Sequence, residues 1–460
     1  MEKTGFKIYS LLLVKNEADI IAYSLTDACR WSDKIIVIDN GSTDGTWEII
    51  QELAKTKPQI VPWLRYEGPF HIGLRAKAYK AFKNEMTAND WWCVRLDADE
   101  LFNCDVKDFL SHVPRTYQTV SKESTDYILT AEDIDCYQFT GHFDKDVEHI
   151  RHFLPHKRRE RRFMRHNPLW IWRENWRYPH PWGRVWKEYI PVKHYQYRSP
   201  EQMRRRFNTR RQAKNDGCGS FKHEKGNDWK DYILTQQQLD EQNLLYHLPE
   251  EFDKSTKTIY KKRNTIKLLG SELVVKRFAA PRFPNNIIYR LFRKSKAERS
   301  YIYAQRLKDI TPEPVYWKNI IKHGVIKESY YVNRLSKLPY TFMMLSKDMH
   351  FPHRERHLQD VARFTARLHK QGIIHNDYSG GNILFDDEGH IEMVDLNRVS
   401  FNRKVDIKSG CRNFERLDIE PAACEIMGKA YAKEMGFCEE ECIKLIKKYR
   451  WKKHKQHTWQ

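Results

Sequence analysis

The stretch that decides the fold of the C-terminal half reads Ile374-His375-Asn376-Asp377-Tyr378-Ser379-Gly380-Gly381-Asn382-Ile383-Leu384 and continues at Met393-Val394-Asp395-Leu396-Asn397-Arg398. Asn382 lies five residues after Asp377, and Asp395 lies thirteen residues after Asn382. The apolar residues around a polar turn at 386–389 predict a short hairpin that brings Asn382 and Asp395 to one edge. An Asp carboxylate can orient and deprotonate a hydroxyl, while an Asn oxygen and a second Asp suit magnesium on phosphates. These residue types therefore suit a site that handles protons and a metal ion.

This order and spacing resemble the catalytic loop and the metal-binding Asp of kinases with the protein-kinase fold. The resemblance implies that Asp377 receives the acceptor proton, and that Asn382 and Asp395 hold Mg²⁺ with ATP. An ordinary Asp-rich hairpin is the alternative interpretation of these residues.

Residues upstream of this stretch also fit a kinase domain. Two strands are expected at 258–269 and 272–278, joined at Gly270-Ser271. The second strand carries Lys276 as the expected contact to the ATP phosphates, and a helix over 294–308 carries Glu298 as its expected ion-pair partner. Met343-Met344-Leu345 is expected to be the hinge that receives adenine.

Over residues 258–450 the chain resembles the bacterial lipopolysaccharide-core kinases, which phosphorylate Kdo or heptose. The chain departs from protein kinases in lacking a G-x-G-x-x-G loop and an Ala-Pro-Glu motif, and Asn376 replaces the Arg that senses a phosphorylated activation loop. The resemblance therefore implies a non-protein substrate. A pseudokinase or binding module is the alternative.

The N-terminal half alternates expected strands with expected helices. The strands are expected at 6–14, 34–39, 60–64 and 91–96. This alternation predicts an α/β domain whose parallel sheet is covered on both faces. Ligands of such sheets bind beyond the carboxyl ends of the strands. Glu17, Asp39 and Asp97 each follow a strand, so we expect them to converge on one rim.

Three motifs at these strand ends resemble family 2 glycosyltransferases with the GT-A fold, over roughly residues 6–200. They are Lys15-Asn16-Glu17-Ala18, Asp39-Asn40-Gly41-Ser42-Thr43-Asp44-Gly45-Thr46 and Leu96-Asp97-Ala98-Asp99-Glu100. The resemblance implies that Glu17, Asp39 and Asp97 bind the nucleotide sugar. It also implies that Asp97 and Asp99 hold Mg²⁺ or Mn²⁺ beside the diphosphate. A generic nucleotide-fold sheet edge is the alternative.

Two further residues are candidates for the transferase site. His194, at the end of an expected strand, would complete the metal shell as it does in GT-A enzymes, or it would be a hydrogen-bonded structural His. Family members usually invert the anomeric centre and use one carboxylate as the base. Glu174 is the candidate for that catalytic base, and a solvated or Arg-paired Glu is the alternative.

The segment 149–211 is both basic and rich in aromatic residues. Aromatic faces stack on sugar rings and arginines bind phosphates bidentately, which favours an anionic glycolipid acceptor. The same composition suits single-stranded nucleic acid, and a basic, aromatic-rich nucleic-acid-binding protein is therefore the rival hypothesis. A third interpretation is a partly solvated helix with an aromatic core.

Composition limits the setting in which the protein works. The chain has 460 residues and a formal net charge of +20, which favours polyanionic partners. It has no run of 18 apolar residues, its start lacks the pattern of a signal peptide, and its nine cysteines form no C-x-x-C pair. We expect a cytoplasmic protein with reduced thiols that binds peripherally to the cytoplasmic face of the inner membrane.

Together these patterns predict two domains with an α/β and an α+β fold. A Rossmann-like GT-A nucleotide-sugar domain is expected at 1–214, a linker or helical junction at 215–255, and a two-lobed protein-kinase-like domain at 256–460. The expected function is bifunctional, with hexosyl transfer from a nucleotide sugar and ATP-dependent phosphorylation of a core sugar such as Kdo or heptose. The expected partners are the nucleotide sugar, ATP, an anionic glycolipid acceptor and the inner-membrane surface, with no nucleic acid.

Overall fold

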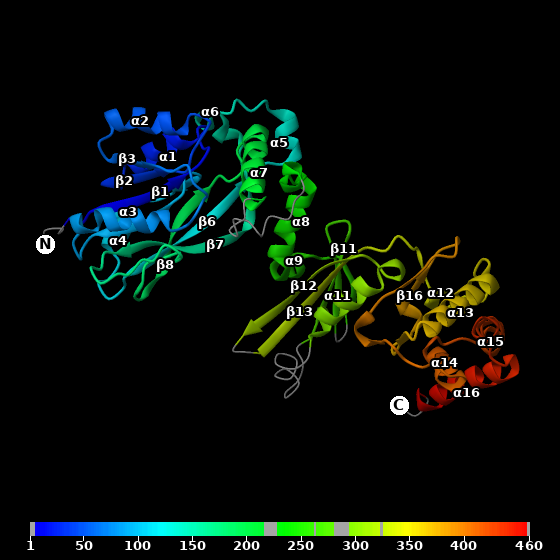
Figure 1. The fold of residues 1–460 in the computed structure, drawn as a ribbon. Coiled ribbons are helices and arrows are strands. Elements are labelled where there is room, and N and C mark those ends of the chain that lie inside the picture. The colour runs from blue at the N-terminus through cyan, green and yellow to red at the C-terminus, as the bar shows by residue number, and fades with distance from the viewer. Residues whose placement is uncertain (1–4, 216–227, 262–263, 280–293, 323–324, 458–460) are drawn as a thin grey trace. The chain divides into compact units, whose positions relative to one another are not determined.

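The computed structural model describes residues 5–215, 228–261, 264–279, 294–322 and 325–457. The chain divides into two compact units, Met1–His247 and Leu248–Gln460, which are described separately (Figure 1). The loop-like segment expected from residue 215 to 228 lies mostly outside the described residues. Among the residues that are described, no helix is long and apolar enough to cross a membrane.

The first unit is built on one eight-stranded sheet in the order β3-β2-β1-β4-β7-β6-β8-β5. Its strands are β1 (Ile8–Val14), β2 (Lys34–Asp39), β3 (Ile60–Arg65), β4 (Trp91–Leu96), β5 (Glu100–Phe102), β6 (Thr119–Ile128), β7 (His152–Arg165) and β8 (Val185–His194). The first four pair in parallel, as the sequence predicts. Strand β7 pairs antiparallel with both β4 and β6, so the sheet as a whole is mixed.

Side chains alternate along the parallel strands and make both faces of this sheet apolar, and helices cover both faces. In β1, Ile8, Leu12 and Val14 enter one core cluster, whereas Leu11 and Leu13 enter the other. Helices α1 (Ile21–Ala28) and α2 (Thr46–Thr56) cover the first face and α3 (Leu74–Phe82) covers the second (Figure 1). A buried strand with apolar residues in both directions must have a cover on each side. This packing fixes the strand ends that carry the predicted site.

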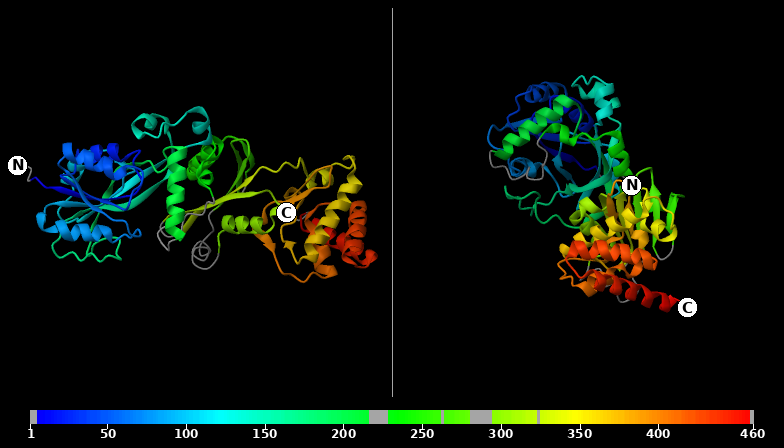
Figure 2. Two further views of the ribbon diagram at one scale, coloured as in Figure 1. Left: turned by 45° about the horizontal axis from the view of Figure 1, so that its top comes forward. Right: turned by 90° about the vertical axis from the view of Figure 1, so that its right-hand side faces the viewer.

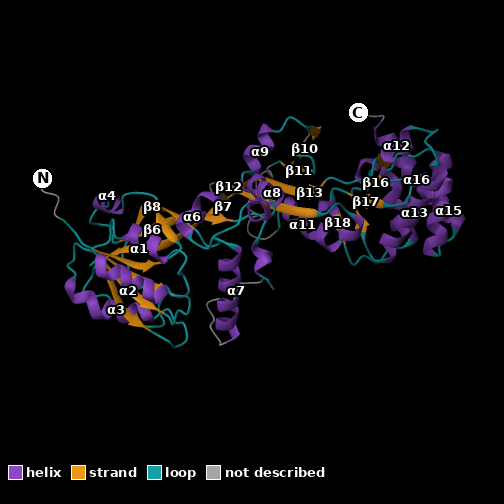
Figure 3. Cartoon of the chain, turned by 90° about the horizontal axis from the view of Figure 1, so that it is seen from above, coloured by secondary structure: helices purple, strands orange, loops and turns teal. Residues whose placement is uncertain are grey.

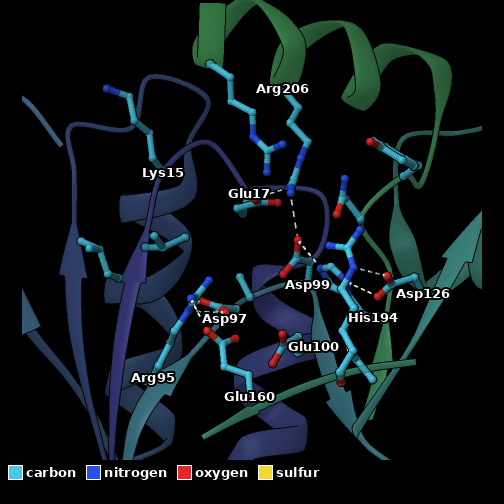
Figure 4. Close-up of a pocket in the computed structure, with 18 of the residues that line it drawn as sticks. Lys15, Glu17, Arg95, Asp97, Asp99, Glu100, Asp126, Glu160, His194 and Arg206 are labelled. Atoms are coloured by element: carbon cyan, nitrogen blue, oxygen red, sulfur yellow. Dashed lines mark hydrogen bonds and ion pairs between the residues drawn. The ribbon is translucent and has the colours of Figure 1, made fainter. Parts of the chain in front are cut away.

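The remaining helices of the first unit follow the sheet or connect its strands. They are α4 (Val106–Ser111), α5 (Ala131–Cys136), α6 (Phe143–Asp146), α7 (Pro200–Asn215) and α8 (Gln236–Tyr246). Helix α7 begins at Pro200, a residue whose fixed φ suits a first helical turn. It starts soon after the end of β8, so its arginines lie near the carboxyl ends of the parallel strands (Figure 4).

The second unit begins with helix α9 (Leu248–Lys254) and a five-stranded antiparallel sheet in the order β12-β13-β11-β10-β9. The strands are β9 (Thr258–Lys261), β10 (Thr265–Leu269), β11 (Leu273–Phe278), β12 (Pro314–Lys322) and β13 (Val325–Arg334), and α11 (Lys296–Arg306) packs against them. The expected single strand at 258–269 is two antiparallel strands, β9 and β10. The expected hairpin between β10 and β11 is confirmed.

Mainly helices make up the rest of this unit (Figure 3). They are α12 (Phe342–Lys347), α13 (Arg354–Lys370), α14 (Ile407–Arg412), α15 (Pro421–Met435) and α16 (Glu439–His457), and Figure 2 shows α14 to α16 grouped in orange and red. The short strands are β14 (Tyr340–Thr341), β15 (Ile374–His375), β16 (Ile383–Phe385), β17 (Ile391–Met393) and β18 (Val399–Ser400). The predicted hairpin is confirmed, because β16 pairs antiparallel with β17. Residues 343–345, which are expected to be the hinge that receives adenine, lie inside α12, and their contact with adenine stays a prediction.

Candidate functional sites

A pocket of about 2190 Å³ opens at the carboxyl ends of the parallel strands of the first unit. Lys15 and Glu17 follow β1, and Asp97 and Asp99 follow β4. Figure 4 shows Glu17, Asp97 and Asp99 near His194, which comes from the end of β8, whereas Lys15 points away from them. The structure therefore brings together residues that lie far apart in the sequence, because parallel strands end at a common edge.

Three arginines surround Asp97, and two of them, Arg75 and Arg162, are buried. Arg95 Nε lies 2.8 Å from Asp97 Oδ2, Arg162 Nη1 lies 3.3 Å from the same oxygen, and Arg75 Nη2 lies 3.4 Å from Oδ1. Burial opposes the charge on Asp97, but the guanidiniums outweigh burial and hold the pKa of its carboxyl below the ordinary value. Asp97 is therefore an ionised carboxylate that is already compensated by the protein.

Asp99 faces an imidazole rather than a set of arginines. His194 Nε2 lies 3.4 Å from Asp99 Oδ2, and His194 Nδ1 lies 2.8 Å from Asp126 Oδ1. Burial would lower the pKa of His194, but the two carboxylates outweigh burial and raise it to about 9. A carboxylate behind an imidazole is the usual support for a metal-ligating His, because it fixes the ring and its tautomer.

The donors at Asp99 and His194 fit one side of a divalent-ion site. Arg206, from α7, reaches the same carboxylate, with Nη1 3.1 Å from Asp99 Oδ2 (Figure 4). Within the described residues, Asp97, Asp99 and His194 do not form a set of three ligand atoms that all lie within 4.8 Å of one another. The fit therefore rests on Asp99 and His194, and the role of Asp97 as a direct ligand stays a prediction.

Glu17 lines the same pocket, whereas Asp39 is buried at the end of β2. Arg198 and Arg206 pair with Glu17, whose pKa is raised because burial outweighs the pairing. Asp39 is fully buried, its Oδ1 accepts a hydrogen bond from the Ser42 backbone at 2.8 Å, and its Oδ2 has no hydrogen-bond partner. A buried acceptor without a partner costs free energy, but Asp39 does not line the pocket, so its contact with a nucleotide sugar stays a prediction.

Glu174 lies apart from these residues. It is exposed, does not line the pocket, and packs so closely on the start of α3 that Gly73 has no room for a Cβ. Its assignment as the base stays a prediction. The pocket wall instead contains Glu160, which the sequence analysis missed. Arg95, Arg162 and Arg177 outweigh burial and lower the pKa of Glu160, and Tyr178 donates a hydrogen bond to it.

The aromatic residues of the basic segment are mainly structural. Trp170 and Trp172 are buried in the core cluster beneath α3, and three further rings pack partly buried against the same cluster (Trp176, Tyr178 and Trp182). Strand β7 carries the arginines from 158 to 165, and helix α7 carries those from 204 to 211. Arg158 and Arg159 are more than half exposed and line the pocket, as does Tyr189, whose ring lies 4.2 Å from the Arg159 guanidinium. The exposed, charged part of the segment therefore faces the pocket.

The second candidate site lies in the second unit, where β11 and the hairpin β16–β17 meet. Lys276, in β11, is buried, and its Nζ lies 2.6 Å from Asp395 Oδ1. Asp395 has a φ of +59°, a left-handed backbone that non-glycine residues seldom adopt, and Asn397 donates a hydrogen bond to its carboxylate. Strained residues of this kind cluster at functional sites, where the surrounding structure holds them in place.

Asp377 and Asn382 lie on the loop between β15 and β16. Asn382 Nδ2 donates to the Asp377 carbonyl at 2.9 Å, so its Oδ1 is the atom left to bind a cation. The His375 Nδ1 accepts the Asp377 backbone N–H at 3.1 Å, and its Nε2 lies 3.0 Å from the Val394 carbonyl. Burial lowers the pKa of His375. His375 is thus a neutral ring that ties the Asp377 loop to the Asp395 loop.

Glu298 lies in the first turn of α11, but the ion pair that the structure shows for it is with Lys294, at 3.9 Å. Lys276 pairs with Asp395 instead. The predicted contact between Glu298 and Lys276 is therefore not formed in this structure, because Asp395 lies closer to the ammonium. The role of Glu298 stays a prediction for the nucleotide-bound protein.

Two family models match separate parts of the chain. Residues 11–119 match the model of glycosyl transferase family 2, and residues 343–449 match the model of the lipopolysaccharide kinase (Kdo/WaaP) family. The first match covers the strand-end motifs and the second covers Asp377, Asn382 and Asp395.

Curated relatives match short parts of the chain. An uncharacterized glycosyltransferase of Rickettsia typhi is 33% identical over 107 residues, which are 23% of this chain and 32% of the relative. A Rickettsia conorii counterpart is 31% identical over 107 residues, 23% of this chain and 34% of the relative. The chain thus spans about a third of the length of these relatives. The serine/threonine-protein kinase greatwall of Bos taurus is 41% identical over 54 residues, 11% of this chain and 6% of that kinase.

Among solved structures, the chain is similar to one titled WaaP in complex with acyl carrier protein. The TM-score is 0.33 at 12% sequence identity, and the match covers 45% of this chain and 91% of that chain.

Proposed function

Because the chain carries a family 2 glycosyl transferase domain of the GT-A fold followed by a kinase-like domain of the lipopolysaccharide kinase family, we propose that it is a bifunctional enzyme. Residues 1–214 would transfer a hexose from a nucleotide sugar, and residues 256–460 would phosphorylate a core sugar such as Kdo or heptose with ATP. Residues 215–255 would join them. Both acceptors belong to one anionic glycolipid of the cell surface.

In the transferase half, the chain supplies groups for the nucleobase and for the diphosphate of a nucleotide sugar. The unpartnered Oδ2 of Asp39 would accept an N–H of the nucleobase. Asp99 and His194, with Asp97 beside them, would hold Mg²⁺ or Mn²⁺, which neutralises the charge that builds on the departing diphosphate. Arg206 lies over Asp99 and lines the pocket, where its guanidinium would also attract the diphosphate.

The acceptor side of the transferase pocket is cationic. Arg158 and Arg159 on β7 and Arg177 line it, and each is more than half exposed. These charges favour a phosphorylated or acidic glycolipid over a neutral one. An inverting displacement needs one carboxylate to take the proton of the acceptor hydroxyl, and Glu174 remains the candidate that the sequence suggests for that base.

In the kinase half, Asp377 would orient the acceptor hydroxyl and receive its proton. Asn382 Oδ1 and the Asp395 carboxylate would hold Mg²⁺, which neutralises the phosphate oxygens of ATP. Lys276, now paired with Asp395, would bind those phosphates, and Glu298 would then hold the ammonium. The Lys276–Asp395 pair keeps the two charged groups of the site in place before the nucleotide enters.

The observation that best supports the kinase is the convergence of Lys276, Asp395, Asn382 and Asp377 from distant parts of the second unit. Each is the residue type that its role requires. The test is transfer of labelled phosphate from ATP to purified core glycolipid by the full chain, alongside sugar transfer from nucleotide sugars. A protein that binds Mg²⁺–ATP but phosphorylates no glycolipid would be a pseudokinase.

The net charge of +20 favours binding to anionic lipid, which would place both halves at the membrane surface that holds their acceptor. Joining two activities in one chain raises the effective concentration of a shared acceptor at the second site. Binding to anionic vesicles should weaken steeply between low salt and roughly molar salt, because ions screen surface charge. Binding that salt does not change would contradict this electrostatic attachment.

A further inference from the structure

Both carboxylate oxygens of Asp377 are paired with arginines. Arg416 Nη1 lies 2.5 Å from Asp377 Oδ1, and Arg398 Nη1 lies 3.3 Å from Asp377 Oδ2. The two arginines come from different 3₁₀ turns, Leu396–Arg398 and Asn413–Arg416. The residue assigned to receive the acceptor proton is thus held between two guanidiniums.

These two arginines differ from the structural arginines of the same unit. Arg354, for example, is mostly buried and binds Glu420 through two nitrogens, at 2.9 and 2.8 Å, next to the start of α15. Arg398 is 54% exposed and Arg416 is 40% exposed. An exposed ion pair adds only about 0–1 kcal/mol to stability. Holding the fold together is therefore a weak explanation for placing both arginines on Asp377.

The local charge balance favours an anion beside Asp377. Two guanidiniums face one carboxylate, while the nearby Asp395 is already paired with Lys276, and Glu415 lies against Arg412. The cluster of Asp377 with its two arginines thus carries one excess positive charge. A guanidinium has five N–H donors in a planar fork, which matches a carboxylate or a phosphate. The excess charge lies where the acceptor hydroxyl must approach.

We propose that Arg398 and Arg416 form an anion subsite that selects an acceptor sugar bearing a carboxylate or a phosphate near the hydroxyl that is phosphorylated. This inference rests on the proposed kinase activity. The acceptor anion draws the guanidiniums from Asp377 and frees its oxygens. The acceptor oxygen then bonds to the γ-phosphorus of ATP, the bond from that phosphorus to ADP breaks, and the hydroxyl proton passes to Asp377.

A neutral acceptor lacks the group that displaces the arginines. Its hydroxyl must compete with two guanidiniums for the oxygens of Asp377, so it is bound weakly and oriented poorly. Charge selection therefore acts through the acceptor and leaves the nucleotide site unchanged. Arg398 and Arg416 are specificity residues in this account, whereas Asp377 remains the proton acceptor.

The test compares probes that differ only in charge. The full chain is assayed for phosphate transfer from ATP to the methyl glycoside of Kdo and to the methyl ester of the same glycoside. Heptose and heptose phosphate form a second pair, which distinguishes a carboxylate subsite from a phosphate subsite. We expect the unmodified protein to prefer the charged member of one pair by about tenfold or more in kcat/KM.

Substitutions locate the origin of that preference. Arg416→Gln and Arg398→Gln should each raise KM for the charged probe by about tenfold and leave Mg²⁺–ATP binding unchanged in calorimetry. Arg416→Lys should restore part of the preference, because it keeps the charge without the planar fork. Arg412→Gln is the matched control, since Arg412 is exposed in the same segment but pairs with Glu415. It should keep the full preference.

Three outcomes would overturn the inference. The unmodified protein could phosphorylate charged and neutral probes equally, or the Arg398→Gln/Arg416→Gln double variant could keep the preference while it still binds Mg²⁺–ATP. Either result leaves the kinase assignment intact. A protein that phosphorylates neither the probes nor purified core glycolipid overturns the kinase assignment and the anion subsite together.

Discussion

Asp97 in the first unit and Asp377 in the second are both carboxylates held by arginines, but the arginines differ in burial. Arg162, beside Asp97, is fully buried and also pairs with Glu100 and Glu160. Arg398 and Arg416, beside Asp377, are roughly half exposed. A buried guanidinium cannot leave its partners without exposing uncompensated charge, whereas an exposed one can move to a ligand at little cost. The same pairing is thus structural in one site and exchangeable in the other.

The largest effect is expected at Asp377. Asp377→Asn should lower phosphate transfer by about a thousandfold or more, because the amide cannot receive the acceptor proton. Mg²⁺–ATP binding by calorimetry should persist, since nucleotide binding does not need the base. Asp395→Ala is the contrasting variant, which should lose productive Mg²⁺–ATP binding as well as turnover. Normal phosphate transfer by Asp377→Asn would show that the catalytic assignment is wrong.

The buried Arg162 should contribute much more to the stability of its unit than the exposed Arg416 does. Arg162→Met should destabilise the first unit by about 3–5 kcal/mol, because Asp97, Glu100 and Glu160 lose a shared partner in a buried site. Arg416→Gln should change the stability of the second unit by no more than about 0.5 kcal/mol. Hydrogen exchange of β4 and β7 amides, and of α13 amides, measures the two units separately. Equal losses of stability in both units would contradict a structural role for Arg162 and an exchangeable pairing of Arg416.

Substitution of Asp99 or Asp97 should lower sugar transfer by a smaller factor than Asp377→Asn lowers phosphate transfer. Asp99→Ala should lower transfer by about a hundredfold, or about 3 kcal/mol in the barrier, because the departing diphosphate loses metal-borne charge. Asp97→Ala should lower transfer similarly and should also destabilise the first unit, since three arginines lose their carboxylate. The measurement is initial rate with and without chelator. Full transfer by either variant with chelator present would contradict the metal assignment.

The contributions of His194 and His369 to stability should respond to pH in opposite directions. The pKa of His194 is raised to about 9 in the folded protein from an ordinary value of 6.5, so its charged form stabilises the fold. That contribution, up to about 3 kcal/mol, is fully present below pH 6.5 and is lost as the pH rises to about 9. Burial lowers the pKa of His369, so the second unit instead loses stability as the pH falls below about 6.5.

Chemical denaturation in chelator, compared with His194→Gln and His369→Gln, measures both responses. The advantage of the unmodified protein over His194→Gln should shrink toward alkaline pH. Its advantage over His369→Gln should shrink toward acid pH. A pH-independent difference in either comparison would contradict the corresponding assignment.

The strand-end carboxylates could be predicted from the sequence because their positions follow from local pattern. Buried apolar runs such as Tyr9 to Val14 identify strands, and parallel strands bring Glu17 and Asp97 to one edge. The apolar residues on either side of the polar turn at 386–389 predicted the β16–β17 hairpin in the same way. Short-range periodicity and turn residues are therefore enough to predict these strands, this hairpin and the carboxylates at the strand ends.

The partners of those carboxylates could not be predicted, because they depend on tertiary contacts. Arg162 reaches Asp97 only because β7 pairs antiparallel with β4, and the basic composition around residue 160 gave no sign of a strand. Arg398 and Arg416 meet Asp377 through two 3₁₀ turns without a sequence signature. The helix at Met343 could not be predicted either, because α12 buries only Phe342 and Leu345 of the apolar run and leaves Met343 and Met344 exposed.

The most direct test of two independent active sites in one chain is mass spectrometry of the core glycolipid from cells that lack this protein and carry single-site variants. Asp99→Ala should yield glycolipid that lacks one hexose-sized mass, and Asp377→Asn should yield glycolipid that lacks one phosphate. The unmodified chain should restore both. The loss of phosphate in Asp99→Ala cells would be compatible with the account only if the missing hexose is itself the phosphorylated sugar. Core glycolipid that is unchanged when the protein is absent would contradict the account.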